Sequence, residues 1–196
     1  MRLIITRHGE TEENKQGIIQ GHLPGHLSKE GRAQAQKLAL RLKDERIDYI
    51  YASDLARAAD TASIIHKYHA DTPIEFVTAL REKKLGEWEG KKKTDIGLSI
   101  SQSVSAYAPK GAETTEQIFE RAKAFLDEVI SKHRDGTVLL VGHNGINKAL
   151  IAVITGKHHA DIGVIENQRN TAITIYDIDE DSKHRMHVFN CTRHLQ

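Results

Sequence analysis

The amino-acid sequence predicts an α/β fold in which a mostly parallel sheet carries an antiparallel edge. Short apolar runs rich in β-branched residues recur along the chain, and segments with the spacing of amphipathic helices separate them. Near the end, two runs of alternating character follow each other with no helix between them, as antiparallel strands do. A chain of 196 residues can bury a sizeable core, and we expect one domain over residues 1–196.

The predicted strands alternate with helices along most of the chain. Two strands, at residues 3–5 and 138–141, are apolar enough to be buried on both faces. Two further parallel strands and the antiparallel pair complete the set, at residues 47–51, 74–77, 172–178 and 185–189. A polar turn over residues 179–183 connects the antiparallel pair.

Helices are predicted where apolar residues recur every three or four positions. Ser28 is a candidate N-cap for the first, and another helix begins at Asn144 and runs to Ile154. A third, long helix ends before Asp135 and Gly136. The apolar positions that predict helices are Ala33, Leu38 and Leu42, then Leu55, Ala59, Ala62 and Ile65, then Ile118, Ala122, Phe125, Leu126, Val129 and Ile130.

Charge and composition exclude several classes of protein. Lys and Arg number 28 and Asp and Glu 27, which gives a net charge of +1, and no block of like charge indicates a nucleic-acid partner. The apolar runs are far shorter than the roughly 20 residues that span a bilayer, and the first one is too short for a signal peptide. The single cysteine, Cys191, cannot form an internal disulfide, which favours a cytoplasmic location.

Twelve histidines raise the question of a metal site. Three close pairs occur, but none has Cys, Asp or Glu partners at a recognised ligand spacing, and no His-Glu-x-x-His motif is present. We therefore expect neither a metal nor another cofactor. The pairs, for which surface positions are expected, are His66 and His69, His158 and His159, and His184 and His187.

Two histidines directly follow the two most apolar strands, in Arg7-His8-Gly9-Glu10-Thr11 and in Gly142-His143-Asn144-Gly145. Ligands of open α/β sheets bind beyond the carboxyl ends of the strands, so both imidazoles should face one crevice. An imidazole beside an arginine could accept a phosphoryl group, and the N–H groups at a helix start could bind an anion. A surface His-Arg pair and an ordinary helix cap explain these residues about equally well.

Four motifs occur in order along nearly the whole chain. They are Arg7-His8-Gly9-Glu10-Thr11 with Asn14, Ser53-Asp54-Leu55-Ala56-Arg57, Leu80-Arg81-Glu82 with Gly86-Glu87-Trp88-Glu89-Gly90, and Gly142-His143-Asn144-Gly145. Together they resemble the motifs of the histidine phosphatase superfamily, also called phosphoglycerate mutase-like. The resemblance implies a three-layer α/β/α sandwich with a mixed, mostly parallel central sheet.

The resemblance also implies roles for the motif residues. His8 would be the nucleophile that becomes phosphohistidine. Glu82 would be the proton donor, a choice that spacing alone leaves open between Glu82, Glu87 and Glu89. The residues expected to hold the phosphoryl oxygens or the substrate include Asn144, which begins the helix that runs to Ile154. The others are Arg7, Asn14, Gln20, Gly21, Arg57 and His143.

This chemistry makes demands on protonation. His8 must be neutral to attack, so its other ring nitrogen should donate a hydrogen bond to a nearby backbone carbonyl. A protonated His143 would join Arg7 and Arg57 in a cationic cradle for the phosphoryl oxygens. Glu82 would protonate the leaving alcohol and then activate water.

These residues predict a metal-independent phosphatase for a small phosphorylated metabolite, such as a sugar phosphate. Phosphoglycerate mutase is the alternative within the family, but the short region between Glu82 and Glu113 has only Trp88 and Tyr107 as aromatic residues, which favours hydrolysis. A non-catalytic phosphate sensor or scaffold is the alternative of another class. Six cations over residues 81–93 could hold a second anionic group, although a solvated charged face is the commoner explanation.

The segment of residues 91–110 is the least regular part of the chain. Four serines at every second position, between two basic ends, match neither a helix nor a buried strand. We interpret this segment as a lid or insertion that selects the substrate. The sequence indicates no particular oligomeric state.

Overall fold

A six-stranded sheet with the strand order β3-β2-β4-β1-β5-β6 forms the centre of the molecule. The computed structural model describes residues 1–179 and 184–196. β1 to β4 are mutually parallel, whereas β5 and β6 are added antiparallel beside β1. Most of the turn predicted at residues 179–183 lies outside the described residues. The strands are β1 (Arg2–Arg7), β2 (Tyr49–Ser53), β3 (Ile74–Val77), β4 (Thr137–Gly142), β5 (Ile173–Asp177) and β6 (Arg185–Cys191).

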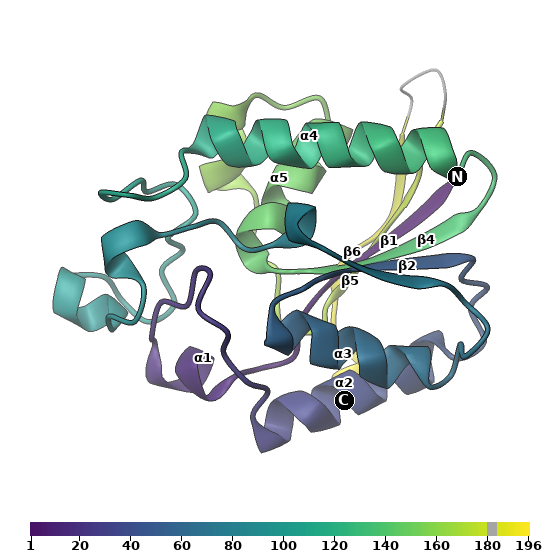
Figure 1. Ribbon diagram of the computed structural model, residues 1–196, viewed down its shortest axis with the longest axis horizontal. Coiled ribbons are helices and arrows are strands. Elements are labelled where there is room, and N and C mark those ends of the chain that lie inside the picture. The colour runs from purple at the N-terminus through teal and green to yellow at the C-terminus, as the bar shows by residue number, and fades with distance from the viewer. Residues whose placement is uncertain (180–183) are drawn as a thin grey trace.

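Helices cover both faces of this sheet (Figure 1). α4 and α5 pack on one face and α2 and α3 on the other, which confirms the predicted three-layer α/β/α sandwich. Within residues 1–179 and 184–196, no helix has the length and apolar character needed to cross a membrane. The helices are α1 (Glu12–Gln16), α2 (Lys29–Leu42), α3 (Ala56–His66), α4 (Thr115–Lys132) and α5 (Asn144–Ile154).

The starts of α1, α2 and α4 are fixed by side chains that bond to free backbone groups. Ser28 caps α2 as predicted, because its hydroxyl oxygen accepts from the N–H of Gly31 at 2.9 Å. Thr114 and Gln117 form a capping box at the start of α4. Each such N-cap stabilises its helix by about 1 kcal/mol.

Two apolar cores lie on the two faces of the sheet. Leu3 and Ile5 pack under α4 and α5, whereas Ile4 between them packs against α2 and α3. Residues 138–141 of β4 alternate in the same way and are fully buried. The prediction that these two strands are buried on both faces is confirmed.

The second strand begins two residues later than predicted. Ile47 and Asp48 precede it, and each takes part in a hydrogen bond between a side chain and the backbone. The hydroxyl of Thr72 donates to the carbonyl oxygen of Ile47, and the carboxylate of Asp48 accepts from the N–H of Thr137. The apolar character of Ile47 therefore reflects burial before the strand rather than a place in it.

The carboxyl ends of the parallel strands gather several segments at one edge of the sheet. Arg7 at the end of β1 lies in register with Gly142 at the end of β4, so His8 and His143 follow from neighbouring strands. β5 runs in the opposite direction, and the residues just before it therefore reach the same edge. α1 and the irregular segment 81–114 lie at this end as well (Figure 1).

Candidate active site

A cavity of about 360 Å³ opens at this edge of the sheet. His143 lies directly behind it, fully buried, with its ring centroid 5.0 Å from that of His8. The structure therefore brings all the predicted site residues together, although they come from separate stretches of chain. Those that line the cavity are Arg7, His8, Asn14, Gln20, Gly21, Arg57, Glu82 and Asn144.

The His8 imidazole is held as a neutral ring with one free nitrogen. Its Nδ1 lies 2.7 Å from the carbonyl oxygen of Gly9. A carbonyl oxygen can only accept, so the proton is on Nδ1 and Nε2 carries a free lone pair. Burial, together with the charges of Arg57 and Arg7, holds the pKa of His8 well below 6.5. At neutral pH this nitrogen is available as a nucleophile.

The two arginines combine bonds to backbone carbonyls with buried N–H groups that could bind a ligand. One terminal nitrogen of Arg7 donates to the carbonyl oxygen of Gln168 at 2.8 Å, and the guanidinium of Arg57 donates to the carbonyls of Gly21, Leu23 and Pro24. The Nε of each arginine is buried and has no partner among residues 1–179 and 184–196. Burial lowers the pKa of Arg57 to about 10, so the group stays charged at neutral pH. Unpaired buried donors are costly, and an anion would satisfy them.

His143 differs from the expectation that it is protonated. Burial and the nearby charge of Arg57 hold its pKa well below 6.5, so the ring is neutral. Both of its ring nitrogens are buried without a partner in the described part of the chain. The sequence could not show that His143 is neutral, because its pKa is lowered by burial among segments that are distant along the chain. A bound dianion would offset the charges of the arginines and favour the protonated ring.

Glu82 is oriented by backbone donors. Its Oε1 accepts from the N–H groups of Lys83 and Gly145, each at 2.8 Å, which leaves the other carboxyl oxygen unengaged by them. The start of α5 therefore binds an anionic group, and in this structure that group is the carboxylate of Glu82. Glu89 instead accepts from the N–H groups of Leu85 and His22, and the described lining of the cavity includes neither Glu89 nor Glu87.

The remaining predicted residues shape the cavity wall. Asn14 closes the capping box of α1, with its Oδ1 accepting from the N–H of Thr11. Gly21 has φ = +49°, and the carboxylate of Glu89 fills the space where a Cβ would lie. Asn144 accepts from the N–H of Gln168 at 2.9 Å through its Oδ1. These residues therefore combine a place in the cavity wall with contacts that fix neighbouring loops.

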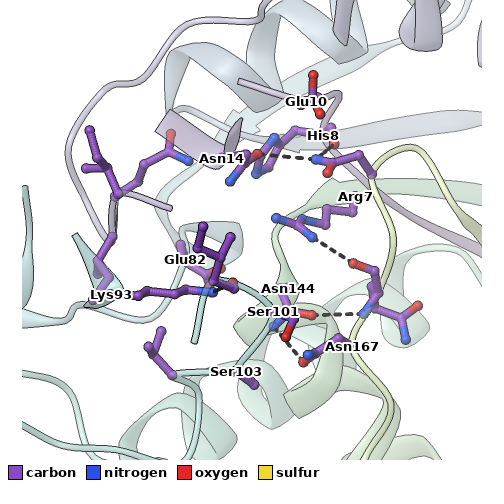
Figure 2. A pocket seen from close by; sticks show the side chains of 18 of the residues that line it. Arg7, His8, Glu10, Asn14, Glu82, Lys93, Ser101, Ser103, Asn144 and Asn167 are labelled. Carbon is purple, nitrogen blue, oxygen red and sulfur yellow. Dashed lines mark hydrogen bonds between the residues drawn. The ribbon is translucent and has the colours of Figure 1, made fainter. Parts of the chain in front are cut away.

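One part of the cavity was missed by reasoning from the sequence, and another was expected only as one of the six cations over residues 81–93. Lys93 of segment 91–110 lines it, and so does a loop over residues 167–170 (Figure 2). The loop could have been found, because a polar run directly before a predicted antiparallel strand must lie at the carboxyl edge of the parallel ones. For Lys93 no signal distinguishes it from its neighbours Lys91 and Lys92.

Two members of the close histidine pairs have ordinary hydrogen-bond partners in the structure. His66 bonds to the carbonyl oxygen of Thr72, and His187 bonds to the carboxylate of Asp177. Among residues 1–179 and 184–196, no three His, Cys, Asp or Glu side chains are grouped so that they could hold a metal ion.

The two buried neutral histidines should make stability depend on pH. The pKa of His8 and of His143 is lowered on folding, so the unfolded chain binds more protons below about pH 6.5. As the pH drops from about 6.5 toward the folded-state pKa, each of these two histidines is expected to lower the free energy of unfolding by about 1.4 kcal/mol per pH unit. Urea titrations between about pH 7 and pH 5 measure this slope. A His143→Asn variant with an unchanged slope would contradict it.

Residues 3–192 match the family model of the histidine phosphatase superfamily, branch 1. A metal-independent phosphoserine phosphatase of Arabidopsis thaliana is 33% identical over 162 residues, which are 78% of this chain and 68% of that protein. A glucosyl-3-phosphoglycerate phosphatase of Mycolicibacterium vanbaalenii is 32% identical over 168 residues, 79% of this chain and 74% of that protein. The solved structure of Bacillus stearothermophilus YhfR is 29% identical, with a TM-score of 0.89 over 100% of this chain and 99% of that one. The chain therefore belongs to branch 1 of the histidine phosphatase superfamily and is a phosphoric monoester hydrolase.

Proposed function

We propose that the protein hydrolyses a small phosphate monoester without a metal, through a phosphohistidine on His8 and with Glu82 as the proton donor. The observation that carries this proposal is that Arg7, Arg57 and His8, whose Nε2 is free, line one cavity, and that His143 packs against His8. Buried nitrogens of Arg7, Arg57 and His143 have no partner within the described residues. A phosphate dianion offers acceptor oxygens to such donors and a phosphorus atom to the imidazole. Losing one donor of such a cradle costs on the order of 3 kcal/mol in the transition state.

The reaction would proceed in two displacements. In the first, Nε2 of His8 attacks phosphorus, and the ester oxygen leaves with the bonding electron pair and takes the proton of Glu82. In the second, the Glu82 carboxylate takes a proton from water while the water oxygen attacks phosphorus. The P–N bond then breaks, its electron pair returns to Nε2, and Glu82 is again protonated.

Residues 1–196 would act as one domain, with segment 91–110 as an insertion that covers the cavity. Lys93 and residues 100–104 of this segment line the cavity. Lys83 anchors the segment, because its buried ammonium donates to the carbonyl oxygens of Ser105 and Tyr107 at 2.8 and 2.7 Å. The part of the substrate beyond the phosphate would therefore contact this segment.

The position of Lys93 supports a substrate with a second anionic group. Two of its three N–H groups donate to the carbonyl oxygens of Ile100 and Gln102, at 2.6 and 2.7 Å, which leaves one for a ligand. Figure 2 shows Lys93 reaching into the cavity from the side opposite Arg7. Phosphoserine and glucosyl-3-phosphoglycerate, named for two relatives, both carry a carboxylate beside the phosphate.

Turnover of a panel of phosphate esters tests the proposal. With EDTA present, we expect a kcat of about 1 s⁻¹ or more on at least one of p-nitrophenyl phosphate, phosphoserine, 3-phosphoglycerate and glycerol phosphate. Isomerisation of 3-phosphoglycerate to 2-phosphoglycerate without phosphate release would identify a mutase instead. No turnover of any ester would indicate a phosphate-binding protein and overturn the proposal.

A Lys93→Met variant separates recognition of the second group from catalysis. Loss of one charge-assisted hydrogen bond, about 1.5–3 kcal/mol, should lower kcat/KM for phosphoserine about 10- to 150-fold and leave p-nitrophenyl phosphate nearly unchanged. Lys92→Met, at the exposed neighbouring position, is the matched control. Equal losses on both substrates would show that Lys93 only holds the segment together.

A further inference from the structure

Residues 166–170 form a loop that contacts the end of β1, and residues 167–170 of this loop line the cavity. The carbonyl oxygen of Gln168 accepts from Arg7 at 2.8 Å, and the amide of Asn170 donates to the carbonyl oxygen of His8 at 2.9 Å. The N–H of Gln168 donates to Asn144 at 2.9 Å. One loop thus contacts the phosphate-binding arginine, the nucleophile and the start of α5.

On its other side, this loop is held by one side chain of the edge strand β6. The Oδ1 of Asn190 accepts from the N–H of Arg169 at 2.9 Å. Its Nδ2 donates to the carboxylate of Glu166 at 2.7 Å and to the carbonyl oxygen of Asn167 at 3.0 Å. Both N–H groups of the amide and its oxygen are used, and all three bonds go to the loop.

The backbone of β6 is bent to aim Asn190 at the loop. The register between β5 and β6 shifts between Ile173 and Ile175, where Ile173 pairs with Cys191 and Ile175 with Val188. Asn190 lies in this bulge with φ = +48°, a left-handed conformation that asparagine tolerates better than most residues. Bulges of this kind re-aim side chains beside active sites.

The end of the loop carries strain that has to be held. Thr171 is fully buried with φ = +56°, a conformation that β-branched residues rarely adopt. Its N–H donates to the carbonyl oxygen of Arg7 at 3.0 Å. A strained residue persists only where the surrounding contacts fix it, so a loosened loop would relax and shift the backbone contact to Arg7.

We propose that Asn190 is a positioning residue that sets the loop of residues 166–170 against Arg7, His8 and Asn144, and thereby sets the affinity of the site for a phosphate dianion. The inference rests on the proposed function for its meaning in catalysis. What it claims about the structure is that Asn190 fixes the positions of the groups that would bind the phosphate. A shift of about 1 Å in a positioned group can lower the rate of a reaction on the order of 10²-fold.

Two variants remove the anchor in different ways. Asn190→Gly keeps the left-handed backbone and loses all three side-chain bonds. Asn190→Asp keeps the size and the bond from Arg169, but it places an oxygen against the carboxylate of Glu166 and the carbonyl of Asn167. A second change, Glu166→Gln, turns that repulsion back into a hydrogen bond, because the new amide can donate to the new carboxylate. Cys191→Ala on the same strand is the control for general destabilisation.

The test measures the Kd of inorganic phosphate by calorimetry, with thermal unfolding and kcat recorded for the same proteins. We expect Asn190→Gly and Asn190→Asp to weaken phosphate binding about 10- to 100-fold. The double variant that combines Asn190→Asp with Glu166→Gln should recover most of the loss. Cys191→Ala should bind phosphate like the wild type. Wild-type phosphate affinity in both single variants, or no recovery in the double variant, would overturn the proposal.

The same measurements keep this proposal separate from the proposed function. If the wild type binds phosphate but turns over no ester, the proposed function fails, and the affinity ratios still support or overturn the role of Asn190. If the wild type does not bind phosphate, the positioning role is overturned as well.

Discussion

A His8→Asn variant is expected to lose phosphatase activity by a factor on the order of 10⁴ or more. The substitution keeps an amide that can donate to the carbonyl oxygen of Gly9, so the surrounding cradle should stay in place. It removes the nitrogen that is proposed to attack phosphorus, and without a nucleophile only binding and charge stabilisation would remain. Release of p-nitrophenol from p-nitrophenyl phosphate in the presence of EDTA measures the loss.

The matched control for this variant is His26→Asn, at an exposed position in the loop before α2. It should retain wild-type activity. Acid quenching of the wild type during turnover should trap a phosphoryl group on the peptide that contains His8, detectable by mass spectrometry. Equal activity of the wild type and the His8 variant would rule out the phosphohistidine route.

A Glu82→Gln variant should separate the two displacements. Glutamine still accepts from the N–H groups of Lys83 and Gly145 but carries no acidic proton. For an alkyl phosphate, whose leaving oxygen needs a proton, we expect a loss of about 10²- to 10⁴-fold. For p-nitrophenyl phosphate, whose leaving group needs little help, the first step should survive while hydrolysis of phosphohistidine slows.

Rapid-mixing kinetics measure that separation. We expect a burst of p-nitrophenol equal to the enzyme concentration, followed by a slow steady state in which the phosphoenzyme accumulates. Glu87→Gln is the control, because Glu87 is exposed and lies outside the described lining of the cavity. A uniform loss on both substrates without a burst would assign Glu82 a role other than proton transfer.

The sequence was sufficient to predict the positions of those site residues that directly follow buried strands. His8 and His143 each come immediately after an apolar run, and the ends of adjacent parallel strands have to meet. The N-cap Ser28 and the helix from Asn144 to Ile154 were likewise local features, fixed by side chains and spacing close in sequence. Such features can be predicted because each depends on few residues.

Other parts depend on contacts between distant segments and could not be predicted in this way. Spacing alone does not distinguish Glu82 from Glu87 and Glu89 as the proton donor. The Glu82 carboxylate is oriented beside the cavity by the N–H of Gly145, which comes from the start of α5. Lys93 acquires its position through carbonyl groups of its own irregular segment. The neutral state of His143 depends on enclosure from all sides, which no short motif encodes.

The position of β1 in the middle of the sheet has a consequence for the order of events during protein synthesis. This strand leaves the ribosome before the other five, yet its neighbours are β4 and β5, and Ile4 pairs with Leu139 and Ile175. At about 5–20 residues per second, the apolar strand that precedes His8 waits on the order of ten seconds for its first partner. Its apolar side chains stay unpaired during that time, and the cavity at the carboxyl end of β1 can form only after β4 and β5 have joined the sheet.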